Sequence, residues 1–161
     1  MENYFVYPGS FTPPTYGHLR IVERAAEIFP KVTIICSTNP EKSVLRWFSE
    51  EECRKLWRCY RLPGNVDVET FSTFRSKEIM TERIVMIRGV RGIPDMESEN
   101  QVMALNREKF NIRNFFYLWA EVEYVEISSS AVRAAAQRYD FQYLAKSVAP
   151  GIVTKLLRKK D

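Results

Sequence analysis

The chain has little of what metal-binding and disulfide-rich proteins use, with one histidine and three cysteines among 161 residues. A single histidine cannot complete a Cys/His zinc site, and Cys36, Cys53 and Cys59 lack the paired spacing of metal ligands. An odd number of cysteines also cannot form a closed disulfide framework. We therefore expect reduced thiols that serve as packing groups, and no structural metal.

Long apolar runs and a leader segment are missing too. No stretch approaches the roughly 20 apolar residues that a membrane-spanning helix requires. Strand-like residues begin at Tyr4, which leaves no room for a secretory leader. These absences predict a cytoplasmic protein that does not engage a membrane.

Clustered basic charge is scarce, although the net charge is +4. Acidic residues interleave with basic ones along most of the chain, and the one concentrated basic tract, 155–160, suits the exposed end of a last helix. Nucleic-acid binding depends on clustered Lys and Arg, so we expect no nucleic-acid partner. A hydrophobic content of 45% over this length predicts one well-buried domain, residues 1–161.

The apolar pattern alternates between strand-like and helix-like segments. Short β-branched and aromatic runs predict strands at 4–7, 31–36, 66–71, 84–87 and 115–119. Helical spacing predicts helices at 19–29 and 131–139, and a Ser49/Glu52 capping box starts another. Segment 72–83 is polar and weakly patterned. The alternation predicts an α/β fold with a five-stranded parallel sheet covered by helices on both faces.

The one histidine, His18, closes a loop rich in glycine and proline between the first predicted strand and helix. Such a junction presents unpaired backbone N–H groups and the positive end of a helix dipole, and an imidazole can add a donor. The loop therefore favours a bound anion, such as a phosphate. The ordinary alternative is a surface or capping histidine beside a turn.

Three motifs, in order along the chain, resemble those of the nucleotidyltransferase superfamily. Residues 15–18 are similar to its Thr/His-x-Gly-His signature, and residues 127–133 to its second, serine-rich signature. Residues 88–107 resemble the phosphopantetheine adenylyltransferase family within it. The resemblance implies a Rossmann-like dinucleotide-binding fold and transfer of AMP from ATP to 4′-phosphopantetheine, which yields dephospho-coenzyme A and pyrophosphate.

The resemblance also implies roles, position by position. Catalytic roles fall on His18, Lys42 and Arg91. Substrate binding falls on Ser10, Lys42, Arg88 and Phe74, with Thr73 as the alternative to Phe74. Nucleotide binding falls on Ser10, Phe11, His18, Gly89, Val90, Arg91, Glu99, Tyr124, Val125, Glu126, Ile127, Ser128, Ser129 and Ser130.

The resemblance further implies binding partners. Mg²⁺ is expected to be bound mainly through ATP, because the sequence has no dense carboxylate cluster and therefore no metal site of its own. Coenzyme A is expected to inhibit as a product-like ligand. A homo-oligomer is expected, by resemblance a hexamer, and the many aromatic residues favour such an assembly.

The sequence departs from the family pattern at Ser10, Thr12 and Tyr16, where Thr, Asp and Asn are usual, and about two extra residues lie within 44–47. Arg88 and Arg91 also have carboxylates nearby in sequence with which they could simply pair. Two other functions are therefore kept open. One is another nucleotidyltransferase, such as a cytidylyltransferase that activates a small phosphorylated acceptor, and the other is a non-enzymatic nucleotide sensor.

Overall fold

The sheet has five parallel strands in the order β3-β2-β1-β4-β5, in a computed structural model that describes residues 2–38 and 46–160. Its strands are β1 (Tyr4–Gly9), β2 (Val32–Cys36), β3 (Val66–Thr70), β4 (Ile84–Val90) and β5 (Asn114–Trp119). The crossover at the centre places β1 between β2 and β4, so the chain winds outwards in both directions from β1. This confirms the predicted α/β fold with its five-stranded parallel sheet.

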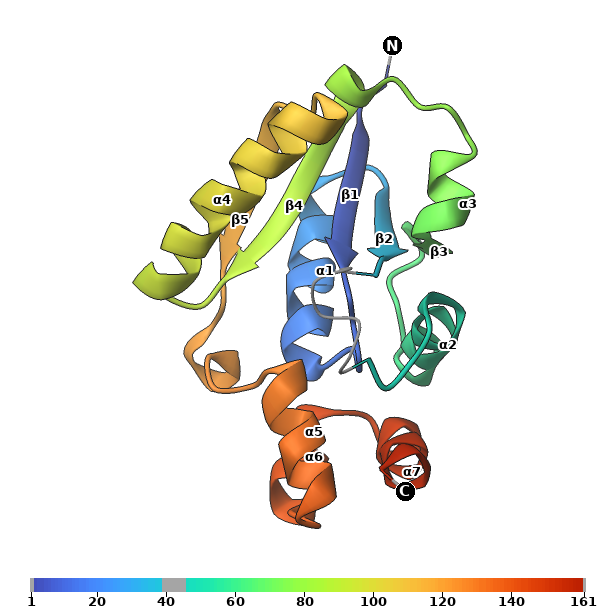
Figure 1. Cartoon of the computed structure of the whole chain (residues 1–161), viewed down its shortest axis with the longest axis vertical. Helices are drawn as coiled ribbons and strands as arrows, with labels where there is room; N and C mark the ends of the chain where they lie inside the picture. The colour runs from blue at the N-terminus through green and yellow to red at the C-terminus, as the bar shows by residue number, and fades with distance from the viewer. Residues whose placement is uncertain (1, 39–45, 161) are drawn as a thin grey trace.

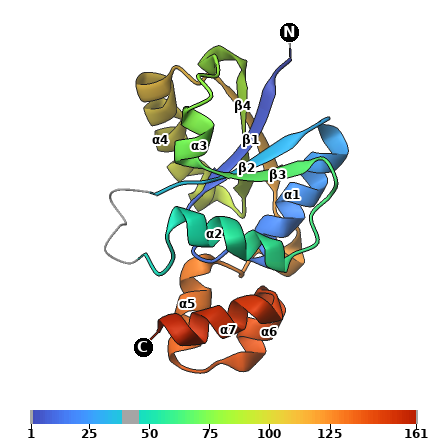
Figure 2. The same ribbon diagram turned by 90° about the vertical axis from the view of Figure 1, so that its right-hand side faces the viewer.

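Helices cover both faces of the sheet. In Figure 2, α1 lies on one side of the strands, while α3 and α4 lie on the other. The helices are α1 (Tyr16–Ile28), α2 (Glu50–Leu56), α3 (Phe71–Arg75), α4 (Ile93–Phe110), α5 (Ser129–Gln137), α6 (Phe141–Ser147) and α7 (Pro150–Lys159), with short 3₁₀ turns at Trp57–Cys59, Thr81–Arg83 and Val122–Tyr124. None of those in the described ranges is long and apolar enough to cross a membrane.

The core is divided by the sheet into two clusters. Successive residues of a strand point to opposite faces, so Val6 packs in one cluster with Phe74, whereas Tyr7 packs in the other. The larger cluster joins α1, α2, α5, α6 and α7, and it encloses Trp57, which is fully buried. Cys36 and Cys53 are buried in this cluster as predicted packing thiols, but Cys59 is exposed.

The carboxyl ends of β1 and β4 point toward α5, α6 and α7 (Figure 1). Ligands of open parallel sheets bind beyond this end of the strands. The loop after β1, the end of β4 and the start of α5 therefore share one rim of the sheet.

Several predicted boundaries are wrong by a few residues. The first helix begins at Tyr16 rather than Leu19, because Thr15 caps it, so His18 belongs to the first helical turn and not to the loop. The third strand ends at Thr70, whose side chain caps α3, a helix within the segment read as weakly patterned. The helix predicted to reach Tyr139 ends at Gln137, and Tyr139 has a left-handed φ of 57°.

The predicted Ser49 capping box is confirmed. The Ser49 hydroxyl accepts from the Glu52 N–H, and the Glu52 carboxylate accepts from the Ser49 N–H. Cys53, Leu56 and Trp57 of this segment are buried, as the helical spacing predicts.

Candidate active site

His18 is held by a capping box in which histidine replaces the usual Glu or Gln. The hydroxyl of Thr15 accepts from the His18 N–H at 3.3 Å, and the Thr15 N–H donates to His18 Nδ1 at 3.0 Å. Thr15 is 1% exposed, so the packing around it holds this cap in place. The helix start thereby sets the orientation of the imidazole.

The same hydrogen bond assigns the protonation of His18. Because Nδ1 accepts from a backbone N–H, a neutral ring carries its proton on Nε2. Burial, together with the smaller effect of the nearby positive charges of Arg91 and Arg88, lowers the pKa of His18 to about 4. At neutral pH the residue is thus an uncharged N–H donor.

Phe11 forms the wall behind this imidazole. Its backbone has a φ of 44°, and its ring packs edge-on against both His18 and Trp57, with centroids 5.1 Å apart in each case. A Cβ on Gly9 would lie 2.6 Å from the Phe11 ring, so this position requires glycine. Since Phe11 is 2% exposed, a ligand of this loop would meet its main chain.

Of the three departures from the family pattern in this loop, Ser10 lines the cavity described below, and Tyr16 and Thr12 lie in different places. Tyr16 packs edge-on against Tyr60, with centroids 5.5 Å apart, and is not among the described residues that line the cavity, so its phenol does not obstruct the site. Thr12 is buried at 7% exposure, and its hydroxyl has no hydrogen-bond partner within the described ranges.

The first turn of α5 contacts this loop, so the two signature segments lie side by side. Ser128 caps the helix by accepting from the Ala131 N–H, and the Ser129 hydroxyl donates to the carbonyl of Pro13 at 2.7 Å. Arg133 donates to the carbonyl of Thr12 at 2.7 Å. Burial lowers the pKa of Arg133, which has no carboxylate partner in the described part of the chain.

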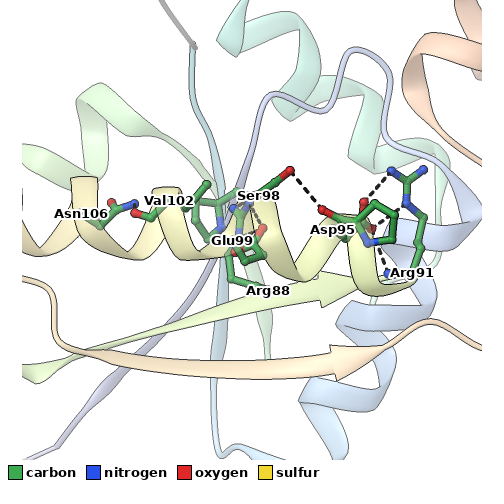
Figure 3. A network of polar contacts seen from close by, with 9 residues as sticks. Arg88, Arg91, Asp95, Ser98, Glu99, Val102 and Asn106 are labelled. Atoms are coloured by element: carbon green, nitrogen blue, oxygen red, sulfur yellow. Dashed lines mark hydrogen bonds and ion pairs between the residues drawn. The ribbon is translucent and has the colours of Figure 1, made fainter.

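Arg88, at the end of β4, forms a half-buried ion pair with Glu99 of α4 (Figure 3). The guanidinium approaches both carboxylate oxygens, with the shortest contact 2.8 Å, and it also reaches the carbonyl of Pro8 at 3.4 Å. Burial lowers the pKa of Arg88, but the bond to Glu99 outweighs this and the net shift is upward. Glu99 is the one buried residue of α4, whose other residues are exposed or of intermediate burial, so the ion pair anchors this helix to the sheet.

Arg91 pairs with Asp95 in the first turn of α4 (Figure 3). The Asp95 carboxylate accepts from the Arg91 N–H at 2.9 Å and from its guanidinium at 3.0 Å. Burial raises the pKa of Asp95, but the contacts with Arg91 outweigh it and lower the pKa. The sequence alternative of simple ion pairing is therefore present for both arginines, although Arg88 pairs with Glu99 rather than with Asp95 or Glu97.

These elements surround one cavity of about 620 Å³. Four arginines line it, together with two carboxylates and a neutral histidine, so its charge favours a polyanion. The predicted site residues that line it are Ser10, Phe11, His18, Arg88, Gly89, Val90, Arg91, Glu99, Tyr124, Ile127, Ser128, Ser129 and Ser130.

Comparisons with known proteins match this geometry. The sequence profile of the cytidylyltransferase-like family matches residues 6–135. The phosphopantetheine adenylyltransferase of Clostridium tetani is 38% identical over 99% of this chain and 98% of its own length, and that of Carboxydothermus hydrogenoformans is 34% identical over 96% and 94%. The chain belongs to the phosphopantetheine adenylyltransferase family. The family expected from the three motifs is thereby confirmed.

Solved structures of other nucleotidyltransferases share the fold of this phosphopantetheine adenylyltransferase family member. The nicotinic acid mononucleotide adenylyltransferase of Plasmodium falciparum, complexed with NaAD, aligns over 98% of this chain with a TM-score of 0.67 and 13% identity. At that identity the likeness speaks for the fold alone. It confirms the Rossmann-like architecture.

The family's nucleotide segment, residues 124–130, divides between this cavity and a smaller one. Val125 and Glu126 line the second pocket with Tyr143 and Lys146, while Tyr124 and Ile127 line both. Arg20 of α1 ties the preceding turn in place through an ion pair of 3.0 Å with Glu121. The segment therefore lies at the β5 side of the main cavity.

Two residues considered for the site, Phe74 and Thr73, lie elsewhere. Phe74 is 8% exposed and packs in the core, because α3 turns its side chain inward toward Val6 and Ile35. It is not among the described residues that line the cavity. Thr73, the alternative, is exposed on α3 and likewise lies outside the cavity lining. Lys42 lies outside the described residues.

Two cavity residues, Arg46 and Arg133, were not singled out from the sequence. Arg133 had a usable signal, because it follows Ser130 by three positions and a helix brings such residues to one face. Arg46 had no such signal in the sequence, because it precedes α2 in a stretch without a periodic apolar pattern.

Proposed function

We propose that the chain transfers the AMP group of ATP to 4′-phosphopantetheine, giving dephospho-coenzyme A and pyrophosphate. The carrying observation is the cavity itself, in which a neutral histidine donor, four arginines and a helix N-terminus face one space. Such a set stabilises negative charge and supplies no general base. The full-length relatives, named phosphopantetheine adenylyltransferases, favour this acceptor and ATP over a cytidylyl donor.

The reaction needs no base from the protein. A phosphate monoester is largely ionised near neutral pH, so it attacks the α-phosphorus of ATP directly. Charge then moves onto the oxygens of that phosphorus and onto the departing pyrophosphate. Fixed N–H donors and cations lower the energy of this transition state.

His18 and Arg91 are proposed to act at the reacting phosphorus. The Nε2–H of His18 has no hydrogen-bond partner in the described part of the chain, so it is available to a phosphate oxygen. The capping box holds the ring before substrate arrives, and a donor that is already oriented costs no reorganisation during the reaction. Lys42 keeps its predicted catalytic and acceptor role as a proposal.

The nucleotide is proposed to lie between the β5 side and α5. Adenine would take the space beside residues 124–127, with Gly89 and Val90 nearby, and the polyphosphate would meet the hydroxyls and N–H groups of residues 128–130. Arg133 adds a cation that no described carboxylate neutralises. Glu99, predicted as a nucleotide contact, is engaged by Arg88 and would act by positioning it.

Ser10 and Arg88 are proposed to receive the phosphate of the acceptor. Both line the cavity, and the Glu99 pair holds the Arg88 guanidinium in one orientation. The predicted Mg²⁺ is proposed to be carried by ATP oxygens and water, because Asp95 and Glu99 are occupied by arginines and the described residues contain no group of three metal-ligating side chains. Bound there, Mg²⁺ would neutralise charge on the polyphosphate.

The oligomeric state, inhibition by coenzyme A and the cellular location are also proposals. A homo-oligomer is supported by large apolar side chains exposed on α4 and β5, namely Ile93, Leu105, Phe110 and Trp119. The hexameric number, inhibition by coenzyme A and a cytoplasmic location rest on the family resemblance.

The deciding experiment offers the protein ATP or CTP with 4′-phosphopantetheine and measures pyrophosphate release and dephospho-coenzyme A by mass spectrometry. Transfer from ATP alone is expected. Unphosphorylated pantetheine is the matched control and should give no product, since it lacks the attacking phosphate. Use of CTP would favour a cytidylyltransferase, and ATP binding without pyrophosphate release from any acceptor would favour a nucleotide sensor.

A further inference from the structure

Arg46 is a cavity cation whose partners within the described residues are neutral. Its guanidinium donates to the carbonyl of Ser37 at 3.1 Å and makes a weak contact of 3.8 Å with Cys53 Sγ. Its Nε is buried without a hydrogen-bond partner, and no carboxylate in residues 2–38 and 46–160 forms an ion pair with it. A half-buried positive charge in such surroundings favours an anion beside it.

The residues that follow fix Arg46 in place. Phe48 is 3% exposed within the larger core cluster, Trp47 packs against that cluster, and Ser49 caps α2. Arg46 therefore lines one defined region of the cavity from an anchored stretch of chain.

That region lies on the opposite side from the nucleotide segment. Ser37 follows β2, and its N–H donates at 2.9 Å to the carbonyl of Gly9, the residue before Ser10. Tyr124 and Ile127 follow β5, at the far edge of the sheet order β3-β2-β1-β4-β5. Arg46 and the nucleotide segment thus approach the loop after β1 from opposite sides.

We infer that Arg46 binds the phosphate of the acceptor and so helps to select phosphorylated over unphosphorylated acceptors. The inference rests on the proposed function. In an in-line displacement the attacking and leaving oxygens lie on opposite sides of the phosphorus. The leaving group is pyrophosphate, and the polyphosphate is assigned to residues 128–130 of α5. The attacking phosphate then enters from across the loop after β1, on the β2 side, where Arg46 is a described cation that has no carboxylate partner within the described residues.

The test compares Arg46→Ala with the wild type for three ligands. The KM for 4′-phosphopantetheine is expected to rise about tenfold or more, the usual consequence of losing a charge-assisted hydrogen bond to phosphate. The inhibition constant of unphosphorylated pantetheine and the dissociation constant of ATP are expected to stay within about threefold of wild type. Arg46→Lys should recover part of the loss because it restores the charge.

Arg58→Ala is the matched control, because it removes the same charge from an exposed position just after α2. It should leave all three constants unchanged. An equal loss for phosphorylated and unphosphorylated acceptors in Arg46→Ala would mean that Arg46 only shapes the cavity, and a selective loss for ATP would place it at the polyphosphate. Either result, or unchanged constants, would overturn the inference and leave the proposed function intact. A wild type that does not use 4′-phosphopantetheine would overturn the proposed function itself.

Discussion

The two sides of the cavity handle positive charge differently. On the β4 side, Arg88 and Arg91 each have a carboxylate partner on α4, so this side is oriented and largely neutralised without a ligand. The unpaired side is the rest of the cavity lining, where the donors His18 on α1, Arg133 on α5 and Arg46 after β2 contact carbonyls, a sulfur atom and a backbone N–H. A ligand anion is therefore needed most on the unpaired side. The ion pairs on the β4 side stabilise the fold and orient Arg88 and Arg91 for their proposed roles, whereas the unpaired donors have no carboxylate that competes with a ligand.

The largest effect is expected from His18→Ala, which removes the central donor of the unpaired side. Turnover should fall by about 10²–10³, the usual cost of one oriented donor to a developing charge. His18→Gln is the matched variant, because glutamine can accept the Thr15 N–H and keep the capping box. Pyrophosphate release and thermal melting on both variants would separate catalysis from folding.

Near-full turnover in His18→Ala would contradict the catalytic role. A loss of unfolding free energy above about 2 kcal/mol that His18→Gln restores, with turnover restored as well, would identify a structural histidine instead.

A substitution among the ion pairs of the β4 side should change the stability of the protein rather than its turnover. Glu99→Ala leaves Arg88 half-buried without its partner, which should reduce the free energy of unfolding by about 3 kcal/mol. Added phosphate should stabilise this variant more than it stabilises the wild type, because the freed guanidinium becomes an anion site. Denaturant unfolding with and without phosphate measures both effects, and a stability equal to wild type would show that the pair does not anchor α4.

A smaller effect is expected from pH through His18. Its folded pKa, about 4, lies below the usual value of 6.5, so between these values the unfolded chain binds a proton that the folded chain does not. Stability from this group is complete above about pH 6.5 and is lost as the pH falls. At pH 5 the wild type should lose about 2 kcal/mol more than His18→Gln, relative to pH 7. Parallel urea unfolding curves at both pH values would check this, and equal losses would show that His18 titrates normally.

The smallest effect is expected from Asp95→Asn. The ion pair with Arg91 is partly exposed, so its loss should cost less than about 1 kcal/mol in unfolding free energy. Because Arg91 then loses a competitor for phosphate, affinity for ATP should stay constant or rise slightly. A calorimetric titration measures this, and a severalfold weakening would show that Asp95 is needed to orient Arg91.

The sequence alone was sufficient for the order of the strands and for the family, and for the helices apart from α3. Period-two and helical patterns are local, and so are capping boxes such as that of Ser49, which is why these features were predicted correctly. The ordered motifs likewise fall in the loop after β1, at the end of β4 and at the start of α5, three places that the structure brings to one rim. Boundaries were less certain, because a cap such as Thr15 competes with the loop that precedes it.

Only the tertiary structure decided which charges are paired and which side chains reach the cavity. The partner of Arg88 lies eleven positions away and on the next helix, and Phe74 turns into the core although its neighbours in sequence are polar. Arg46 reaches the cavity because Phe48 is anchored in the core and because β2 lies beside β1. Such placements depend on how separate elements pack, and a one-dimensional pattern carries no record of that packing.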